Sequence, residues 1–124
     1  MCQEFGLEQE NPAIPKIAYG FAGGIGNTGS VCGAVVGAVM AIGLKLGRGE
    51  TMEGMLRNLA VAQEFRERFE AEMGNIGCRE LTGLDLTNQE DLAGLMDSEI
   101  PKKVCFPAVG AAYRLAVELL RESE

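Results

Sequence analysis

Residues 31–46, VCGAVVGAVMAIGLKL, decide the fold of this chain. The stretch is rich in alanine, has no charged residue before Lys45 and predicts a buried helix. Thr28 or Ser30 is expected to cap its start, and the glycines on either side of Arg48 are expected to end it. The glycines at positions 29, 33 and 37 are expected to let a neighbouring helix approach closely. We therefore expect this helix to lie at the centre of the fold.

The segments that follow also have helical periodicity. Residues 51–73 predict the clearest amphipathic helix, a short helix is expected at Cys78, and a capping box at residues 87–90 predicts another. A last helix is expected to begin near Pro101 or Pro107 and to run to about residue 121. The predicted buried stripes are Met52, Met55, Leu56, Leu59, Ala62, Phe65, Phe69 and Met73 in the first of these helices, and Val109, Ala112, Tyr113, Ala116 and Leu120 in the last.

These elements define the expected fold class. No segment alternates between apolar and polar residues over five positions, so no strand is predicted. We expect an all-α fold, a compact bundle of about five helices with a central Gly/Ala-rich helix. The length suits a single cysteine-containing domain over residues 1–124.

Composition and charge exclude several classes of function. The chain contains no histidine, which excludes a Ser-His-Asp triad and His-ligated zinc or haem. The net charge of −7 argues against a nucleic-acid partner, because nucleic acids are bound mainly through Lys and Arg. We find no signal peptide and expect a reducing, cytoplasmic location, where structural disulfides are uncommon. Residues 17–44 carry no charge, but their dense apolar part is too short for a span, so we expect no membrane insertion.

The glycine-rich stretch GIGNTG, residues 24–29, matches the pattern GxGxxG. A dinucleotide site needs a strand before these glycines and a second strand that carries an acid. Here Glu50 has the right spacing but directly follows a helix, so we interpret the stretch as a tight turn. Gly24, Gly26 and Gly33 are nevertheless candidate cofactor-binding positions, because glycines near thiols leave the backbone exposed to a ligand or a partner thiol.

The four cysteines, Cys2, Cys32, Cys78 and Cys105, carry the main chemical signal. None forms a CxxC motif, so any joint chemistry must be assembled by the fold. The last three lie near predicted helix N-termini, where free N–H groups and the helix dipole stabilise a thiolate and lower its pKa. We expect these three to come together in space and Cys32 to be the most reactive thiol. The competing interpretation is that each is a small buried hydrophobe.

The sequence around Cys32 resembles a known family. FAGGIG at residues 21–26, CGAVVG at residues 32–37 and two later cysteines in order are similar to the C-GCAxxG-C-C family of small putative redox-active proteins. The resemblance covers about residues 5–120 and implies that Cys78 and Cys105 correspond to the family's third and fourth cysteines. Cys2 departs from the family pattern, because the family's first cysteine usually lies further ahead of the segment that begins here at Phe5.

Three functions remain open. The first is redox activity by thiol–disulfide exchange or electron transfer, as in a thiol–disulfide oxidoreductase, with Cys32, Cys78 and Cys105 as catalytic residues and an unidentified redox partner. The second is a metal site, in which the same three cysteines and Cys2 hold zinc or an iron–sulfur cluster. The third is a non-enzymatic interaction module without a cofactor, whose glycine face packs against another helix or across a homodimer.

Overall fold

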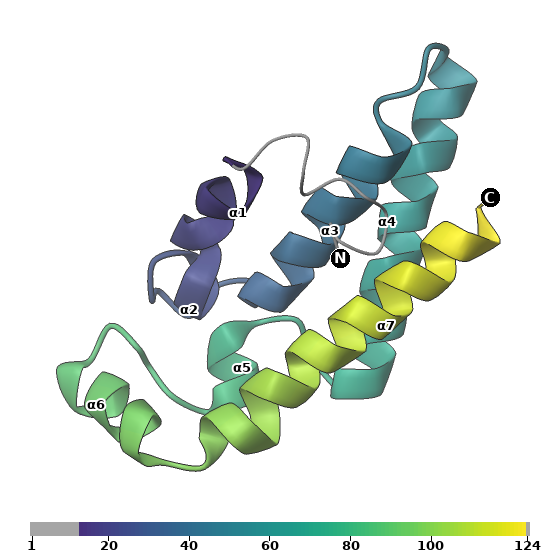
Figure 1. The fold of residues 1–124 in the computed structure, drawn as a ribbon. Helices are drawn as coiled ribbons and strands as arrows, with labels where there is room; N and C mark the ends of the chain where they lie inside the picture. The colour runs from purple at the N-terminus through teal and green to yellow at the C-terminus, as the bar shows by residue number, and fades with distance from the viewer. Residues whose placement is uncertain (1–12, 124) are drawn as a thin grey trace.

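The computed structural model describes residues 13–123, and Figure 1 shows their path. Three short elements come first, and two long helices follow. Short helices and a π-helical turn then lead into the last long helix. The elements are α1 (Ile14–Ile17), a 3-10 turn (Ala18–Phe21), α2 (Ala22–Ile25), α3 (Gly33–Leu46), α4 (Met52–Met73), α5 (Cys78–Thr82), α6 (Gln89–Asp97), the π-helical turn (Pro101–Cys105) and α7 (Phe106–Glu122). Because residues 13–123 contain helices and no named strand, the predicted all-α fold is confirmed.

Local sequence fixes both ends of the longest helix, α4. The Thr51 hydroxyl accepts a hydrogen bond from the Gly54 N–H at 3.0 Å, which satisfies a donor in the first turn. Gly74 ends the helix in a left-handed conformation at φ 91°, a common helix stop. Asn88 caps α6 in the same way as Thr51 caps α4, by accepting from the N–H of Glu90 at 2.8 Å.

The start of α3 differs from the prediction. Neither Thr28 nor Ser30 caps it, and the N-cap is Cys32, whose side chain makes no capping hydrogen bond. The Thr28 hydroxyl instead donates to the Gly24 carbonyl at 2.7 Å, within the preceding turn. Residues 30–32 instead pair with residues 76–78 through backbone hydrogen bonds, and Cys32 has a non-helical ψ of 132°, so the helix begins at Gly33.

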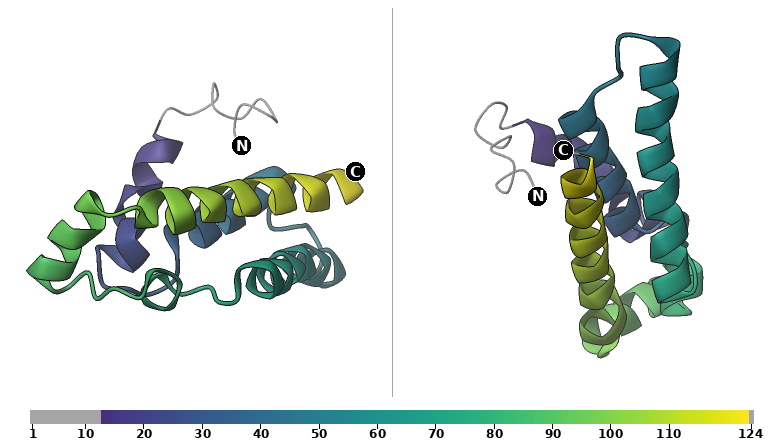
Figure 2. Two further views of the ribbon diagram at one scale, coloured as in Figure 1. Left: turned by 90° about the horizontal axis from the view of Figure 1, so that it is seen from below. Right: turned by 90° about the vertical axis from the view of Figure 1, so that its right-hand side faces the viewer.

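The core lies where α3, α4 and α7 pack together (Figure 2). Phe65 and Phe69 of α4 are fully buried, with ring centroids 6.0 Å apart. From α3 come the buried residues Val35, Ala38 and Ile42. The prediction of a central α3 is therefore met, but α7 shares that position because it buries the longer stripe: Ala108, Ala111, Ala112, Leu115, Ala116, Val117, Leu119 and Leu120.

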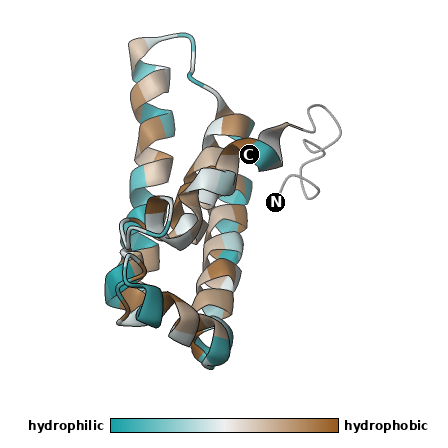
Figure 3. Ribbon diagram, turned by 90° about the vertical axis from the view of Figure 1, so that its left-hand side faces the viewer, coloured by the Kyte–Doolittle hydropathy of each residue, from teal (hydrophilic) through white to brown (hydrophobic). Residues whose placement is uncertain are grey.

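In both α4 and α7, some residues of the predicted buried stripe are exposed. Val109 and Tyr113 of α7 are 56% and 42% exposed. The buried face of this helix consists instead mainly of alanines and leucines. Met52 and Leu56 of α4 are exposed as well, whereas Phe65 in the second half is buried. Figure 3 shows apolar residues along the part of α4 that projects past the other helices. Among the described residues, α7 lies across the C-terminal half of α4, whereas the first half lies beside the C-terminal part of α3 (Figure 1).

The glycines of α3 pack unevenly. A Cβ atom built on Gly33 would lie 3.0 Å from the carbonyl oxygen of Phe21, so this position packs tightly against the turn before α3. A Cβ atom on Gly37 would meet nothing within 4 Å, and Gly37 lines a groove together with Tyr19 and Tyr113. The close approach expected along the glycine stripe is therefore present at Gly33, but the expectation is wrong at Gly37.

The uncharged stretch at residues 17–44 is divided among several elements. α3, its longest helical part, has only 14 residues. Across residues 13–123, no helix combines the length and the apolar character that a membrane span needs.

Candidate functional site

Two cysteines are joined through a short backbone pairing. Val31 and Gly77 form an isolated antiparallel bridge. On either side of it, the N–H groups of Cys32 and Cys78 each donate to a carbonyl of the facing segment at 2.7 Å. The bridge therefore ties the N-cap of α3, Cys32, to the first residue of α5, Cys78, although the two are 46 positions apart in the chain.

The pairing also brings these two cysteines to neighbouring positions. Cys32 lies opposite Ile76, and Cys78 is two positions beyond Ile76. Residues two apart on an extended segment point to the same face, and diagonal neighbours in an antiparallel pair are about 7–8 Å apart. A disulfide needs Cα atoms about 4.4–6.8 Å apart. The pairing therefore places Cys32 and Cys78 at neighbouring positions of two adjoining segments.

A left-handed turn packs against this pairing. All residues from 23 to 27 have positive φ, between 60° and 73°. Ile25 is strained at φ 63°, because β-branched residues rarely adopt this conformation. Gly24 is buried at φ 73°, and a Cβ atom there would lie 2.5 Å from the Ser30 nitrogen and 2.8 Å from the Cβ of Cys78. The absence of a side chain at position 24 therefore allows the turn to contact Cys78.

Cys105 comes from a third element. It is the last residue of the π-helical turn and directly precedes α7. Its φ and ψ of −66° and −48° are helical, so it lies within a continuous helical segment that begins at Pro101. Cys32 and Cys78 thus stand at helix starts as the sequence suggested, whereas Cys105 follows a full π-helical turn.

The three described cysteines line one pocket of about 380 Å³. Its walls come from the left-handed turn, the first residues of α3, α5 and the loop after it, α6, and the junction between the π-helical turn and α7. Besides the thiols, the polar side chains in the lining are Asn27 and Thr82, and no charged side chain of the described residues lines it. The pocket is therefore lined mainly by apolar residues around three thiols. Its full lining is Gly23, Gly24, Asn27, Cys32, Gly33, Ala34, Cys78, Leu81, Thr82, Leu86, Leu92, Leu95, Met96, Val104, Cys105, Ala108 and Val109.

Burial and mutual repulsion act on two of these thiols. Burial raises the pKa of Cys78, and negative charge on Cys32, Cys105 and Glu80 raises it further, against a smaller opposing effect of the Thr82 hydroxyl. Burial and the charge of Cys32 likewise raise the pKa of Cys105. The expected lowering of the pKa is therefore wrong for Cys78 and Cys105. At Cys78 the loss of water around the sulfur outweighs the favourable dipole of the helix start, and Cys105 lies within a continuous helical segment instead of at its start.

The three candidate glycines occupy different positions. Gly24 and Gly33 line the thiol pocket. A Cβ atom on Gly24 would clash with the backbone of Ser30, and a Cβ atom on Gly33 would lie tightly against the carbonyl oxygen of Phe21. Gly26 is exposed, lies outside the pocket lining and has open space in the Cβ direction. Gly24 and Gly33 thus shape the pocket by permitting close packing, and cofactor binding by any of the three stays a prediction.

The donor groups of the described residues do not form a metal site. Within residues 13–123, no group of three or more His, Cys, Asp or Glu side chains is arranged to hold one. Cys32, Cys78 and Cys105 are free thiols. Cys2, the expected fourth ligand, lies outside the described residues. The described residues therefore give the zinc or iron–sulfur alternative no support.

The order of glycines and cysteines agrees with a known family over nearly the whole chain. Residues 1–119 match the family described as "Putative redox-active protein (C_GCAxxG_C_C)". The chain belongs to this family. The resemblance noted in the sequence is thus confirmed, and the description of the C_GCAxxG_C_C family agrees with the broad expectation of redox activity. No curated protein and no solved structure gives a significant match to this C_GCAxxG_C_C protein.

Sequence reasoning missed the pocket wall on α6. Leu92, Leu95 and Met96 line the pocket, although α6 has no buried residue. Their three- and four-residue spacing is an apolar stripe on a short helix, and this pattern could have marked α6 as a packed element.

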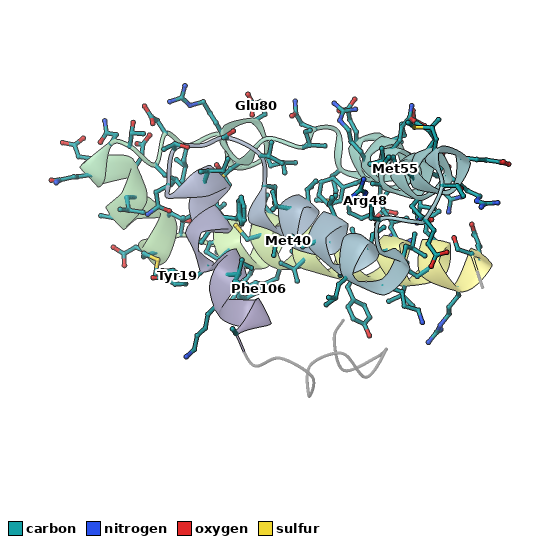
Figure 4. The ribbon with its side chains drawn as sticks, turned by 90° about the horizontal axis from the view of Figure 1, so that it is seen from above. Tyr19, Met40, Arg48, Met55, Glu80 and Phe106 are labelled. Atoms are coloured by element: carbon teal, nitrogen blue, oxygen red, sulfur yellow. The ribbon has the colours of Figure 1, made fainter. Side chains whose placement is uncertain are left out.

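A second pocket lies away from the thiols, between the C-terminal part of α3 and the first half of α4. Arg48 and Met55 line this second pocket and lie together, far from Glu80 on α5 (Figure 4).

Proposed function

We propose that the protein carries out thiol–disulfide exchange, with Cys32 as the attacking thiol and Cys78 as the thiol that completes an internal disulfide. The observation that carries the proposal is the antiparallel pairing of residues 30–32 with residues 76–78. Thiol–disulfide exchange needs a thiolate and a second sulfur within reach and does not need histidine, which the chain lacks.

The assignment of the first attack to Cys32 follows from the other two thiols. Cys78 is buried, and its raised pKa keeps it protonated near neutral pH. The raised pKa of Cys105 has the same effect. Cys32 is the N-cap of α3 and is only partly buried, so it is the thiol left to make the first attack.

The reaction proceeds in two balanced steps with a disulfide substrate of the form R–S–S–R. The Cys32 thiolate attacks one sulfur, a mixed disulfide forms, and the first R–S⁻ leaves. Cys78 then loses its proton to solvent and attacks the Cys32 sulfur, so that the second R–S⁻ leaves. The substrate gains two electrons and becomes two thiols, while the cysteine pair loses two electrons. Cys105 lines the same pocket and is the alternative second thiol when Cys78 is absent.

Peptide mapping after oxidation tests this assignment. The reduced protein is treated with one equivalent of a small disulfide, alkylated and digested, and we expect a linked peptide pair containing Cys32 and Cys78. In the Cys78→Ser variant, the mixed disulfide on Cys32 should persist or resolve onto Cys105. The Cys2→Ser variant is the control and should give the same linked pair as the unmodified protein. Recovery of unlinked Cys32 and Cys78 at every oxidant concentration would contradict the proposal.

A further inference from the structure

We propose that the thiol pocket selects small, uncharged disulfides that carry an apolar group, and that it disfavours anionic ones. This inference rests on the proposed thiol exchange and adds the chemical class of the substrate. The feature that carries it is the pocket around Cys32, Cys78 and Cys105, whose described lining contains no charged side chain.

The size of the pocket suits a small molecule. Its volume of about 380 Å³ lies at the lower end of the range of about 300–1,000 Å³ found for ligand pockets. An aromatic or branched aliphatic group that fits this pocket would contact Leu81, Leu92, Leu95 and Val104, which line the pocket together with the thiols. Its apolar surface would leave water on binding, which is favourable.

The polar groups of the pocket offer little to a charged substrate. The Thr82 hydroxyl donates to the carbonyl of Cys78 at 2.8 Å, so its proton is already used. Asn27 supplies an amide but no charge. A carboxylate bound in this pocket would lose water of hydration without gaining a cationic partner, and this loss is unfavourable. The net charge of −7 adds long-range repulsion against anionic disulfides.

Two aromatic disulfides with the same pyridine ring test the selection: neutral 2,2′-dithiodipyridine and dianionic 6,6′-dithiodinicotinate, which differ by one carboxylate on each ring. Each releases a thiopyridone that absorbs in the near ultraviolet, so the rate of attack is followed by absorbance in the Cys2→Ser background. Each rate is divided by the rate for the same protein unfolded in guanidinium chloride, which removes the difference in intrinsic reactivity. We expect the normalised rate to be at least about tenfold higher for the neutral reagent, because its ring gains apolar contacts.

High salt and one matched pair of variants distinguish the effect of the pocket on the rate from the effect of the overall charge. In 1 M KCl, where the screening length is about 3 Å, long-range repulsion is removed and the preference should persist. Met96→Asp places a charge in the pocket wall, at a side chain that is 76% exposed and therefore tolerates substitution. Met52→Asp makes the same change at a methionine that is 68% exposed on α4, outside the pocket. Met96→Asp should lower the rate with the neutral reagent roughly three- to tenfold, and Met52→Asp should leave it unchanged.

The outcomes distinguish the two proposals. The apolar substrate class is supported if the preference for the neutral reagent persists in 1 M KCl and becomes smaller in the Met96→Asp variant. Equal normalised rates, or equal effects of Met96→Asp and Met52→Asp, with the disulfide between Cys32 and Cys78 still formed, overturn the substrate class and leave thiol exchange standing. If neither reagent produces that internal disulfide, the proposed function itself fails and this inference fails with it.

Discussion

Gly24→Ala is the substitution that most directly tests how the site is held together. Gly24 has φ 73°, a conformation that costs an alanine about 1–2 kcal/mol. The new Cβ would also lie 2.5 Å and 2.7 Å from the backbone nitrogen and oxygen of Ser30, and 2.8 Å from the Cβ of Cys78. Ser30 is itself fixed, because its N–H donates to the Gly24 carbonyl at 3.0 Å and its carbonyl accepts from the Cys78 N–H at 2.7 Å.

The contact therefore cannot be relieved by turning one flexible side chain. Overpacking of this kind costs about 1–3 kcal/mol. Together with the backbone conformation, Gly24→Ala should lower the free energy of unfolding by about 2–5 kcal/mol. Gly26→Ala is the matched control, since Gly26 has φ 60° and nothing within 4 Å of the Cβ position. It should cost only the backbone part, about 1–2 kcal/mol.

Urea unfolding of both variants under reducing conditions measures the difference. Gly24→Ala should also slow formation of the disulfide between Cys32 and Cys78, because the clash pushes Cys78 away from the pairing, and Gly26→Ala should not. If the two variants unfold at the same urea concentration and oxidise at the same rate, the packing of Gly24 against Ser30 and Cys78 does not support the site.

Three further predictions concern stability. The pKa of Cys78 and Cys105 is raised in the folded state, so their contribution to stability is complete below the unfolded thiol pKa of about 8.5 and is lost as pH rises through the folded values. Urea titrations from pH 7 to 10.5 should show this loss, and a double Cys→Ala variant with an unchanged pH slope would disprove the cause. Ile25→Asn should raise the free energy of unfolding by about 0.5–1 kcal/mol, because Asn tolerates the left-handed conformation at φ 63° better than a β-branched residue; a lower melting temperature would count against strain at this position. Gly37→Ala should stabilise the protein by about 0.5–1 kcal/mol, since a helix-interior glycine is replaced where no atom lies within 4 Å; destabilisation on thermal melting would mean that the groove beside Gly37 is filled.

Helix type and order could be predicted from the sequence because they depend on local chemistry. Thr51 and Gly74 are local signals that limit α4 to Met52–Met73, close to the helix predicted over residues 51–73. The start of α3 could not be predicted, because it is set by hydrogen bonds to residues more than forty positions away. Met52 and Leu56 show a related limit. Periodicity identifies an apolar stripe, but it does not say how far along the stripe another helix extends.

The candidate site shows the same division between local and long-range causes. The glycines before Cys32 and the later cysteines were visible as a family pattern, and the chain does belong to that family. The pocket that surrounds the thiols was not visible, because α6 and the start of α7 reach it only through tertiary packing. The same packing reversed the expected pKa direction at Cys78, since the sequence showed the helix start but not the burial.

The bridge between Val31 and Gly77 closes a long loop that contains all of α3 and α4. A covalent bond between Cys32 and Cys78 would close nearly the same loop, of 46 residues, and chain entropy alone gives such a link about 4 kcal/mol of stabilisation. Thermodynamic reciprocity requires the fold to stabilise the bond by the same amount. The reduction potential of the pair would then lie about 85 mV lower in the folded protein than in the unfolded chain. The gain in stability from the disulfide and the lowering of its reduction potential would thus measure the same free energy. The melting temperature of the protein would then depend on whether its surroundings keep the pair oxidised or reduced.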